Sequence, residues 1–419
     1  MQSTISLGLL GPRDRIAAAL SAGALLSTLL LWPFLGNGAA YVGLALSIPT
    51  IAVGWHTPDW QKLLKSPALW ALWGGFVLLA VAFLLQPGWP SISSLVSFSV
   101  FALAPVLMLA IAPLSRSVTL QQFALVCIVG AGFAAAVGLY GMSQGEMRVT
   151  APSLSPIHFA ALAVTLGFMG LGVTLMSASP WRWLALAGPL LGFVASVASG
   201  TRAALVVGCA LALLYGLFWM QRRAMPLWQK LLTPIVLAAS VLLIFYLASL
   251  AGFTRPFDAL RATWGSLTGD LGGDVSTAYR LEMYSAGWQA FVHSPWIGHG
   301  WRDQLTASMP FLSELGRAGY AAEGWAYIHN DALSFAVAAG IMGFAAYCLF
   351  MAAPFLAQRS HGGEGKWSLR AYLAGTFVLG LFVGGATDVL FMVEIPKFAL
   401  VVVTAVLLFL PADPGRSDV

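Results

Sequence analysis

A histidine–asparagine pair, His329-Asn330, closes a long polar loop and opens an apolar segment, in a chain where polar residues are scarce. The pair is followed by nine residues and then by Gly340-x-x-Gly343. Histidine has a pKa near neutrality and can therefore accept a proton at physiological pH. Several arginines lie in the same loop or beside it, and arginine binds phosphate oxygens through a planar, bidentate fork. This combination predicts proton-transfer chemistry on an anionic, lipid-borne substrate.

His329 is the strongest candidate for a general base, although a histidine at the start of a helix is often only an interfacial residue. A helix capped by Asn330 or Asp331 directs its positive end at the imidazole and favours the neutral form that a base needs. An anion bound nearby would instead raise the pKa of the imidazole and favour its charged form. The other histidines are weaker candidates because of their positions on the opposite side, at a span start or beside a turn: His56, His361, His158, His293 and His299.

Two arginines are candidates for binding a phosphate group. Arg280 lies in a stretch, 276–293, with the spacing of an amphipathic helix, and it shares a side with Tyr284. The alternative for Arg280 is a salt bridge to a neighbouring carboxylate, such as Asp274 or Glu282. Arg202 follows Ser199-Gly200-Thr201 between two apolar segments, where an arginine needs an anionic partner. That partner could be a substrate phosphate, a structural carboxylate or a lipid headgroup.

Supporting residues are harder to rank from the sequence. Arg148 has Glu146 close by and is a weaker phosphate ligand than the other two arginines. Asp388, in the turn before the last apolar segment, could orient His329 or could form a purely structural pair. Asn330 and Tyr284 complete the set of possible supporting residues.

The elements that must position these residues are helices in a membrane. Of the 419 residues, 59% are hydrophobic and only 9% charged, with a mean hydropathy of +0.83, whereas soluble domains carry roughly 25% charged residues. Apolar stretches near the roughly 20 residues that cross a bilayer recur along the chain. We therefore expect an all-α polytopic membrane protein of about 12 transmembrane helices, forming a single integral membrane domain over 1–419. The expected spans are 16–35, 38–54, 68–86, 91–113, 118–142, 155–177, 181–198, 203–220, 231–252, 330–356, 368–386 and 391–410.

Lysines and arginines are distributed unevenly between alternate loops, and such positive loops stay in the cytoplasm. With the amino terminus inside, the short outer loops hold only three: Arg148, Arg202 and Lys397. The inner segments hold thirteen: Arg13, Arg15, Lys62, Lys65, Arg116, Arg182, Arg222, Arg223, Lys230, Arg359, Lys366, Arg370 and Arg416. This bias predicts cytoplasmic termini and places the long loop 253–328 outside, between the ninth and tenth spans.

The outer loop 253–328 is predicted to form a cap containing amphipathic helices, because it holds many of the acidic residues of the chain. In its 276–293 helix, Leu281, Tyr284 and Trp288 recur at helical spacing on one face. We expect Trp288, Trp296 and Trp301 to lie near the level of the lipid headgroups. The alternative is a cap that only shields the helix bundle.

Signatures of metal and nucleotide binding are lacking in the sequence. It contains no H-x-x-x-H, C-x-x-C, P-loop or D-x-D pattern. The three cysteines fall inside predicted spans and imply no disulfide framework: Cys127, Cys209 and Cys348. We therefore expect no metal and no cofactor, and the basic loops give no reason to expect nucleic acid as a partner.

Three motifs, in this order, resemble the O-antigen ligase and O-antigen polymerase superfamily of bacterial membrane glycosyltransferases, and the ligases most closely. The motifs cover about 199–205 and 279–343, and the general arrangement covers all of the predicted spans. They are Ser199-Gly200-Thr201-Arg202, then Tyr279-Arg280-Leu281-Glu282-Met283-Tyr284 leading to Ser294-Pro295-Trp296-Ile297-Gly298-His299-Gly300, and finally His329-Asn330 with Gly340-x-x-Gly343.

The resemblance implies a metal-independent, inverting transfer of a glycan from undecaprenyl diphosphate, at the periplasmic face of the bacterial inner membrane. By motif, Arg202 and Arg280 would bind the donor diphosphate and His329 would activate the acceptor hydroxyl. A ligase transfers the glycan to the lipid A core, whereas a polymerase extends a second lipid-linked glycan; the single large outer loop and the histidine–asparagine spacing favour the ligase. From a different class, a secondary transporter would also suit the number of spans. Transporters, however, tend to show two related halves and broken helices at mid-membrane.

Overall fold

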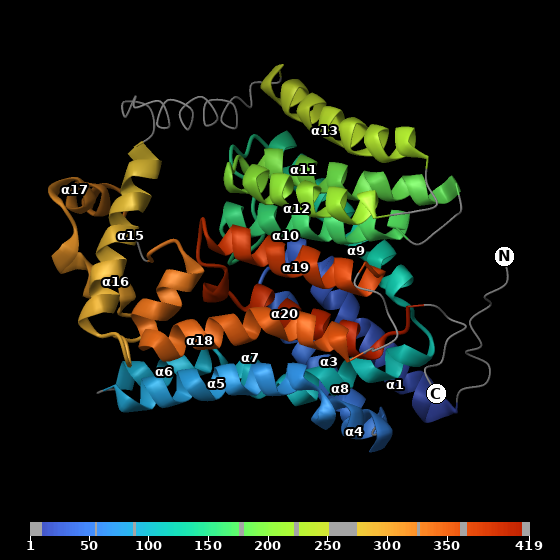
Figure 1. Cartoon of the computed structure of the whole chain (residues 1–419), viewed down its shortest axis with the longest axis horizontal. Helices are drawn as coiled ribbons and strands as arrows, with labels where there is room; N and C mark the ends of the chain where they lie inside the picture. The colour runs from blue at the N-terminus through green and yellow to red at the C-terminus, as the bar shows by residue number, and fades with distance from the viewer. Residues whose placement is uncertain are drawn as a thin grey trace.

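The chain folds into a bundle of helices with a smaller group of helices at one end (Figure 1). The computed structural model describes residues 11–412 apart from 55–56, 87–88, 176–179, 222–225, 251–274, 325–326 and 361–366. Over these residues every regular element is a helix and none is a strand. The predicted all-α fold class is therefore confirmed.

Seven helical segments of the described chain are long and apolar enough to cross a bilayer. Each carries apolar side chains along most of its length, with at most two charged residues in its apolar window. They are Pro12–Leu35 (α1 Pro12–Leu26, a π-helical turn Ser27–Leu31, and α2 Trp32–Leu35), α5 Pro67–Leu85, α9 Leu120–Ser143, Pro156–Leu175 (α10 Pro156–Leu171 and a 3₁₀ turn Gly172–Leu175), Arg182–Ser199 (the end of a 3₁₀ segment Pro180–Leu186, and α11 Ala187–Ser199), α12 Ala203–Met220, and α18 Asp331–Arg359.

The remaining helices of the bundle are shorter or less uniformly apolar. They are α3 Gly38–Gly54, α4 Thr57–Lys65, α6 Trp89–Val96, α7 Ser99–Ala102, α8 Ala104–Ile111 with the 3₁₀ turn Ala112–Arg116, α13 Leu227–Leu250, α19 Leu369–Gly385, the 3₁₀ turn Leu390–Met392, and α20 Glu394–Phe409. Every one of the twelve expected spans overlaps a helix, but twelve crossings stay a prediction.

One expected span, 91–113, is not a single helix. The backbone leaves helical geometry at Phe98 (φ −112°, ψ 7°) and again at Leu103 (φ −83°, ψ 4°). Pro105 then stands in the first turn of α8, where its missing N–H and fixed φ are tolerated. The apolar stretch is therefore divided into α6, α7 and α8, which hydropathy alone does not distinguish from one continuous helix.

Helices begin where a short polar side chain can accept a free backbone N–H of the first turn. Ser66 caps α5, Ser155 caps α10 and Ser368 caps α19. Thr119 and Gln122 form a reciprocal capping box at the start of α9. These caps fix where the chain enters the bundle, and the Ser155 cap matters directly for the candidate site.

α10 forms the centre of one half of the bundle. It packs against α9, α11, α12 and α19, and all of its residues from His158 to Leu171 are buried. In the other half, α5 lies alongside α18 (Figure 1). The outer surface is apolar, with Leu84 63% exposed and Leu213 73% exposed. Contact with lipid explains why such apolar side chains are exposed on this surface.

The cap elements gather at one end of the bundle (Figure 1). They are α15 Val275–His293, α16 Gln304–Ser308, the 3₁₀ turn Met309–Phe311 and α17 Glu314–Glu323. The predicted helix 276–293 is thus confirmed as α15; 251–274, the first part of the predicted cap, lies outside the described residues. Leu281 and Trp288 are 62% and 55% exposed, whereas Met283 and Ala286 are buried. Leu281 and Trp288 of the predicted face therefore point away from the protein, as expected for contact with lipid headgroups. Tyr284, the third residue of that face, is instead partly buried.

The expectation for Trp301 was wrong. Trp296 is 73% exposed, but Trp301 is only 1% exposed and lies in the core. Its ring packs edge-on against Phe98 with the ring centres 4.8 Å apart, and against Phe335 at 5.0 Å. These partners come from distant parts of the sequence, so the local pattern of aromatic residues could not separate Trp301 from its exposed neighbour.

α18 is broken near the end that carries His329. Ala339 (φ −137°, ψ 19°) and Gly340 (φ 63°, ψ −151°) leave helical geometry, so backbone groups on both sides of the break need other partners. A side chain at Gly340 would overlap the main chain of Trp296, and its positive φ favours glycine. Gly340 is thus required by a close approach of two backbones.

The segment 294–300 supplies the missing partners of the broken helix. The Ile341 N–H donates to the Pro295 carbonyl at 2.7 Å, and the His299 N–H donates to the Val337 carbonyl at 2.9 Å. Two motifs that the sequence shows separately are therefore one structural unit. It fastens the end of α15 to the first half of α18, in the helix that follows His329.

Candidate active site

His329 stands immediately before α18 with a left-handed backbone, φ 56°. A residue other than glycine rarely adopts this conformation unless its surroundings impose it. Asn330 caps the helix, because its Oδ1 accepts the Leu333 N–H at 2.9 Å; one of the two predicted caps is thus confirmed. The imidazole is 28% exposed, so it is held by the protein and still open to a substrate.

Asp388 holds the imidazole from the loop between α19 and α20. Its Oδ1 lies 2.9 Å from Nδ1 of His329, and it also accepts the Val389 N–H at 2.9 Å. Burial raises the pKa of Asp388, but the hydrogen bond from His329 and the nearby His158 outweigh burial and hold the pKa below its ordinary value. An ionised carboxylate only accepts hydrogen bonds. The proton of a neutral His329 therefore sits on Nδ1, and Nε2 keeps its lone pair.

The second oxygen of Asp388 is surrounded by residues from the start of α10. The Ser155 hydroxyl donates to Oδ2 at 2.9 Å, and Nε2 of His158 lies 3.3 Å from the same oxygen. The His158 side chain is only 7% exposed. Sequence reasoning passed over His158 as a residue that merely opens a span, because Asp388 lies more than half the chain away.

Asp331 fixes the loop that carries Asp388. Its side chain is wholly buried and accepts the backbone N–H groups of Leu390 at 3.2 Å and Phe391 at 3.1 Å. A side chain at Gly385 would overlap the Asp331 carboxylate, so the approach depends on that glycine. The two segments are therefore joined by two sets of contacts. Asp331, next to the His329-Asn330 pair, binds the loop behind Asp388, and Asp388 binds the imidazole of His329.

Tyr284 connects α15 to the same place. Its hydroxyl lies 3.0 Å from the carbonyls of both His329 and Ala386, so one O–H proton is shared between two acceptors. Burial raises the pKa of Tyr284; Arg280 acts in the opposite direction and Asp388 in the same direction. The charge of Arg280 is therefore close to Tyr284, one helical turn away, and through it close to His329.

The salt-bridge alternative for Arg280 finds no support in the described residues. Glu282 accepts the Ser313 backbone N–H at 3.4 Å and forms no ion pair with Arg280 there. Asp274, the other possible partner, lies outside the described residues. Arg280 therefore stands beside Tyr284 at the cap side of the site.

Arg202 lies at the start of α12, at the same end of the bundle. It follows Gly200, whose φ is 61°, in a turn where the Ser199 and Thr201 hydroxyls are 3.0 Å apart. The turn is joined to the neighbouring loop, because the Val149 N–H donates to the Ala198 carbonyl at 3.0 Å. That loop continues to Ser155, whose hydroxyl donates to Asp388 at 2.9 Å. Arg202 is thus near the candidate site in the fold.

Arg148 precedes the same loop connection and is exposed. The structure brings His329, Asp388 and Tyr284 into direct contact and sets Arg280 beside them. It brings Arg202 and Arg148 to the same end through the backbone between α9 and α10. Within the described part of the chain, no three His, Cys, Asp or Glu side chains are grouped in a way that could hold a metal ion.

Comparison with protein families gives a match. No curated protein matches the chain. The matching family model starts with α11 and ends within α18, so it includes Arg202, Arg280 and His329 but stops before Asp388. Residues 187–348 match the family model described as O-antigen ligase, and this match supports placing the chain in the O-antigen ligase superfamily.

Proposed function

We propose that this chain is an O-antigen ligase, which transfers a glycan from undecaprenyl diphosphate to a sugar hydroxyl of the lipid A core. The observation that carries the proposal is the contact of His329 with Asp388, because it leaves Nε2 of a partly exposed imidazole free to accept a proton. The family match over 187–348 supports the class of reaction. The identity of the acceptor is part of the proposal.

In this reaction the acceptor hydroxyl oxygen attacks the anomeric carbon of the donor. Its proton passes to Nε2 of His329 while the new C–O bond forms. The bond between the anomeric carbon and the diphosphate oxygen breaks, and undecaprenyl diphosphate leaves with the electron pair. Asp388 stabilises the imidazolium that results, as the carboxylate of a histidine–aspartate pair does. Attack opposite the leaving group inverts the anomeric carbon.

The two arginines are assigned to the leaving group. Charge builds up on the departing diphosphate, and fixed cations lower the barrier most when they are placed before the reaction starts. Arg280 is held beside Tyr284 near His329, and Arg202 lies at the same end of the bundle. We assign Arg280 and Arg202 to the diphosphate and keep Arg148 as a possible third contact.

The proposed acceptor distinguishes a ligase from a polymerase, since the same base and cations would serve both. The test is mass spectrometry of lipopolysaccharide from a deletion strain, complemented with the wild-type gene or with His329→Ala. If the protein is a ligase, the deletion strain should keep the glycan on the lipid carrier and carry a lipid A core without glycan. Short glycan still attached to the core would instead indicate a polymerase and overturn the ligase assignment.

A further inference from the structure

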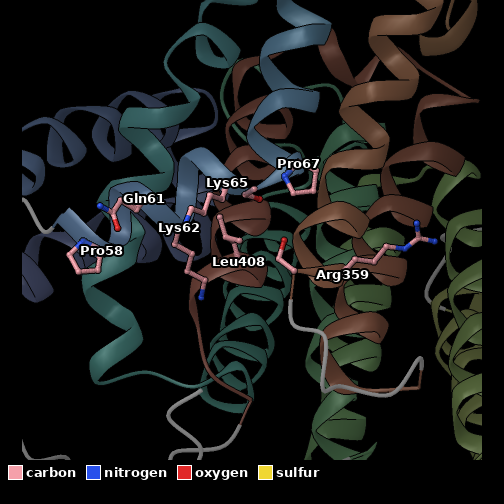
Figure 2. Close-up of a pocket in the computed structure, with 9 residues that line it drawn as sticks. Pro58, Gln61, Lys62, Lys65, Pro67, Arg359 and Leu408 are labelled. Atoms are coloured by element: carbon pink, nitrogen blue, oxygen red, sulfur yellow. The ribbon is translucent and has the colours of Figure 1, made fainter. Parts of the chain in front are cut away.

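A basic pocket lies at the end of α18 opposite to His329. It has a volume of about 630 Å³ and lies between α4, the start of α5, and the ends of α18 and α20 (Figure 2). Lys62, Lys65 and Arg359 line it, together with the hydroxyl-bearing Ser66 and Ser360. None of the described residues that line it is acidic. The pocket thus concentrates positive charge contributed by two distant parts of the sequence.

Two features of the surroundings favour an anion in the pocket; the acidic Asp59 of α4 pairs with Arg116 at 3.7 Å. Ser66 caps α5, whose 19 residues begin at the pocket, and the start of a helix attracts anions. The Lys62 ammonium lies 5.6 Å from the centre of the Phe409 ring, which holds that side chain against α20. Figure 2 shows Lys62 and Arg359 on different helices, with the Arg359 guanidinium pointing away from the lysines. Arg359 is exposed, so it would share a phosphate with the lysines only after rotation about its side-chain bonds.

The pocket lies at the depth of lipid headgroups. The Trp70 indole is 53% exposed and donates to the Leu64 carbonyl at 2.8 Å, beside the pocket; tryptophan prefers the boundary between membrane and water. The 29 residues of α18 separate the pocket from His329. The continuous part of α18 after its break, residues 341–359, is roughly 28 Å long at about 1.5 Å per residue, close to the roughly 30 Å of the hydrocarbon core of a bilayer.

We propose that this pocket binds the phosphate of an anionic phospholipid, at the membrane surface opposite to the candidate active site. Lysine binds phosphate as a point charge and arginine through its fork. Basic pockets between membrane helices hold acidic headgroups in this way. The proposal is independent of the transferase reaction, because none of its residues touches His329 or Asp388.

The test is binding of phosphatidylglycerol to the delipidated full-length chain in neutral detergent, measured by native mass spectrometry. The variants are Lys65→Gln, Arg359→Gln and the double substitution, since Lys62 also contacts Phe409 and is left intact. We expect roughly five-fold weaker binding for each removed charge and about 25-fold for both. Lys65→Arg and Arg359→Lys keep the charge and should bind nearly as well as wild type.

A matched control is Arg13→Gln, which removes an exposed charge on α1 that does not line the pocket. Equal loss of binding in this control would overturn the proposal in favour of diffuse surface charge. Unchanged phosphatidylglycerol binding in the double variant, or equal binding of phosphatidylcholine, would also overturn it. Inorganic phosphate is titrated as a competitor: full displacement at millimolar concentration would identify a free-phosphate site rather than a lipid site. Lower thermal stability of the variants without any loss of lipid binding would overturn the proposal too. It would show that Lys65 and Arg359 only stabilise the ends of their helices.

Discussion

The Asp388 carboxylate lies 2.9 Å from Nδ1 of His329, although 59 residues separate them in the sequence. Each is held by more than this one contact. Tyr284 donates to the backbone at His329, and Asp331 accepts two N–H groups of the loop behind Asp388. The imidazole is therefore oriented before any substrate binds, which is the condition for efficient base catalysis.

Asp388→Asn should remove most of the transfer activity. An asparagine amide can donate to Nδ1 of His329, which stabilises the tautomer with the proton on Nε2 and removes the base. We expect a loss of roughly 10²–10⁴-fold in single-turnover transfer. Because the pKa of Asp388 lies below its ordinary value, the carboxylate stays ionised from about pH 6 to pH 8, and the defect should be similar across that range.

The control for Asp388 is Thr387→Val, which removes a hydroxyl that donates only to the local Gly384 carbonyl at 2.8 Å. It should keep near-normal transfer. Asp388→Asn should also have little further effect in a His329→Ala background, since the two residues act as a unit. Equal losses from Asp388→Asn with and without His329 would show that the carboxylate acts independently of the imidazole.

Gly340→Ala should destabilise the fold at the break in α18. Alanine at φ 63° is strained, and its Cβ would overlap the main chain of Trp296; a strained residue of this kind costs roughly 1–3 kcal/mol. The measurement is the thermal unfolding midpoint of the purified protein in detergent. Gly216→Ala is the matched control, because a Cβ there has no atom within 4 Å and alanine favours a helix. An unchanged midpoint for Gly340→Ala would contradict the rigid junction described for this break.

Arg202→Ala and Arg280→Ala should each weaken binding of the lipid-linked donor. A charge-assisted hydrogen bond contributes roughly 1.5–3 kcal/mol, and lysine should rescue only partly because it lacks the planar fork. Donor binding is measured with both single variants and the double variant. Non-additive effects are expected if both arginines bind one diphosphate. Wild-type affinity in either single variant would exclude that arginine from the site.

Orientation in the membrane can be tested by labelling single cysteines, after replacement of Cys127, Cys209 and Cys348. A cysteine at Leu315, which is 48% exposed on α17 of the cap, should react with a membrane-impermeant thiol reagent in spheroplasts. A cysteine at Arg13, on α1, should react only after lysis. This result follows from the excess of lysine and arginine predicted for the cytoplasmic side. The reverse pattern would place the candidate active site in the cytoplasm.

Local patterns in the sequence predicted the elements of the site well. Helix 276–293 follows from apolar spacing and appears as Val275–His293. The Asn330 cap follows from residue type, and it is observed. Periodicity and capping depend on neighbours within a few residues, so a single sequence contains the information needed for both.

The pairing between distant segments could not be predicted in the same way. The sequence allows Asp388 to orient His329, but it does not distinguish that role from a purely structural pair. Ser155 and His158 lie 233 and 230 positions before Asp388 (388 − 155 and 388 − 158), and only packing of α10 against α19 brings them together. The spacing of Gly340 and Gly343 indicates a family signature. The structure shows why glycine is needed at 340: the residue has a positive φ and lies against the main chain of Trp296.

The most direct test of the central claim is single-turnover transfer by purified His329→Ala, with undecaprenyl-diphosphate-linked glycan as donor and lipid A core as acceptor. The matched control is His293→Ala, which removes an exposed histidine at the end of α15. If His329 is the base, His329→Ala should bind the donor normally yet transfer roughly 10²–10⁴-fold more slowly, and His293→Ala should behave as wild type. Near-normal transfer by His329→Ala at equal protein concentration would contradict the assignment of His329 as the catalytic base.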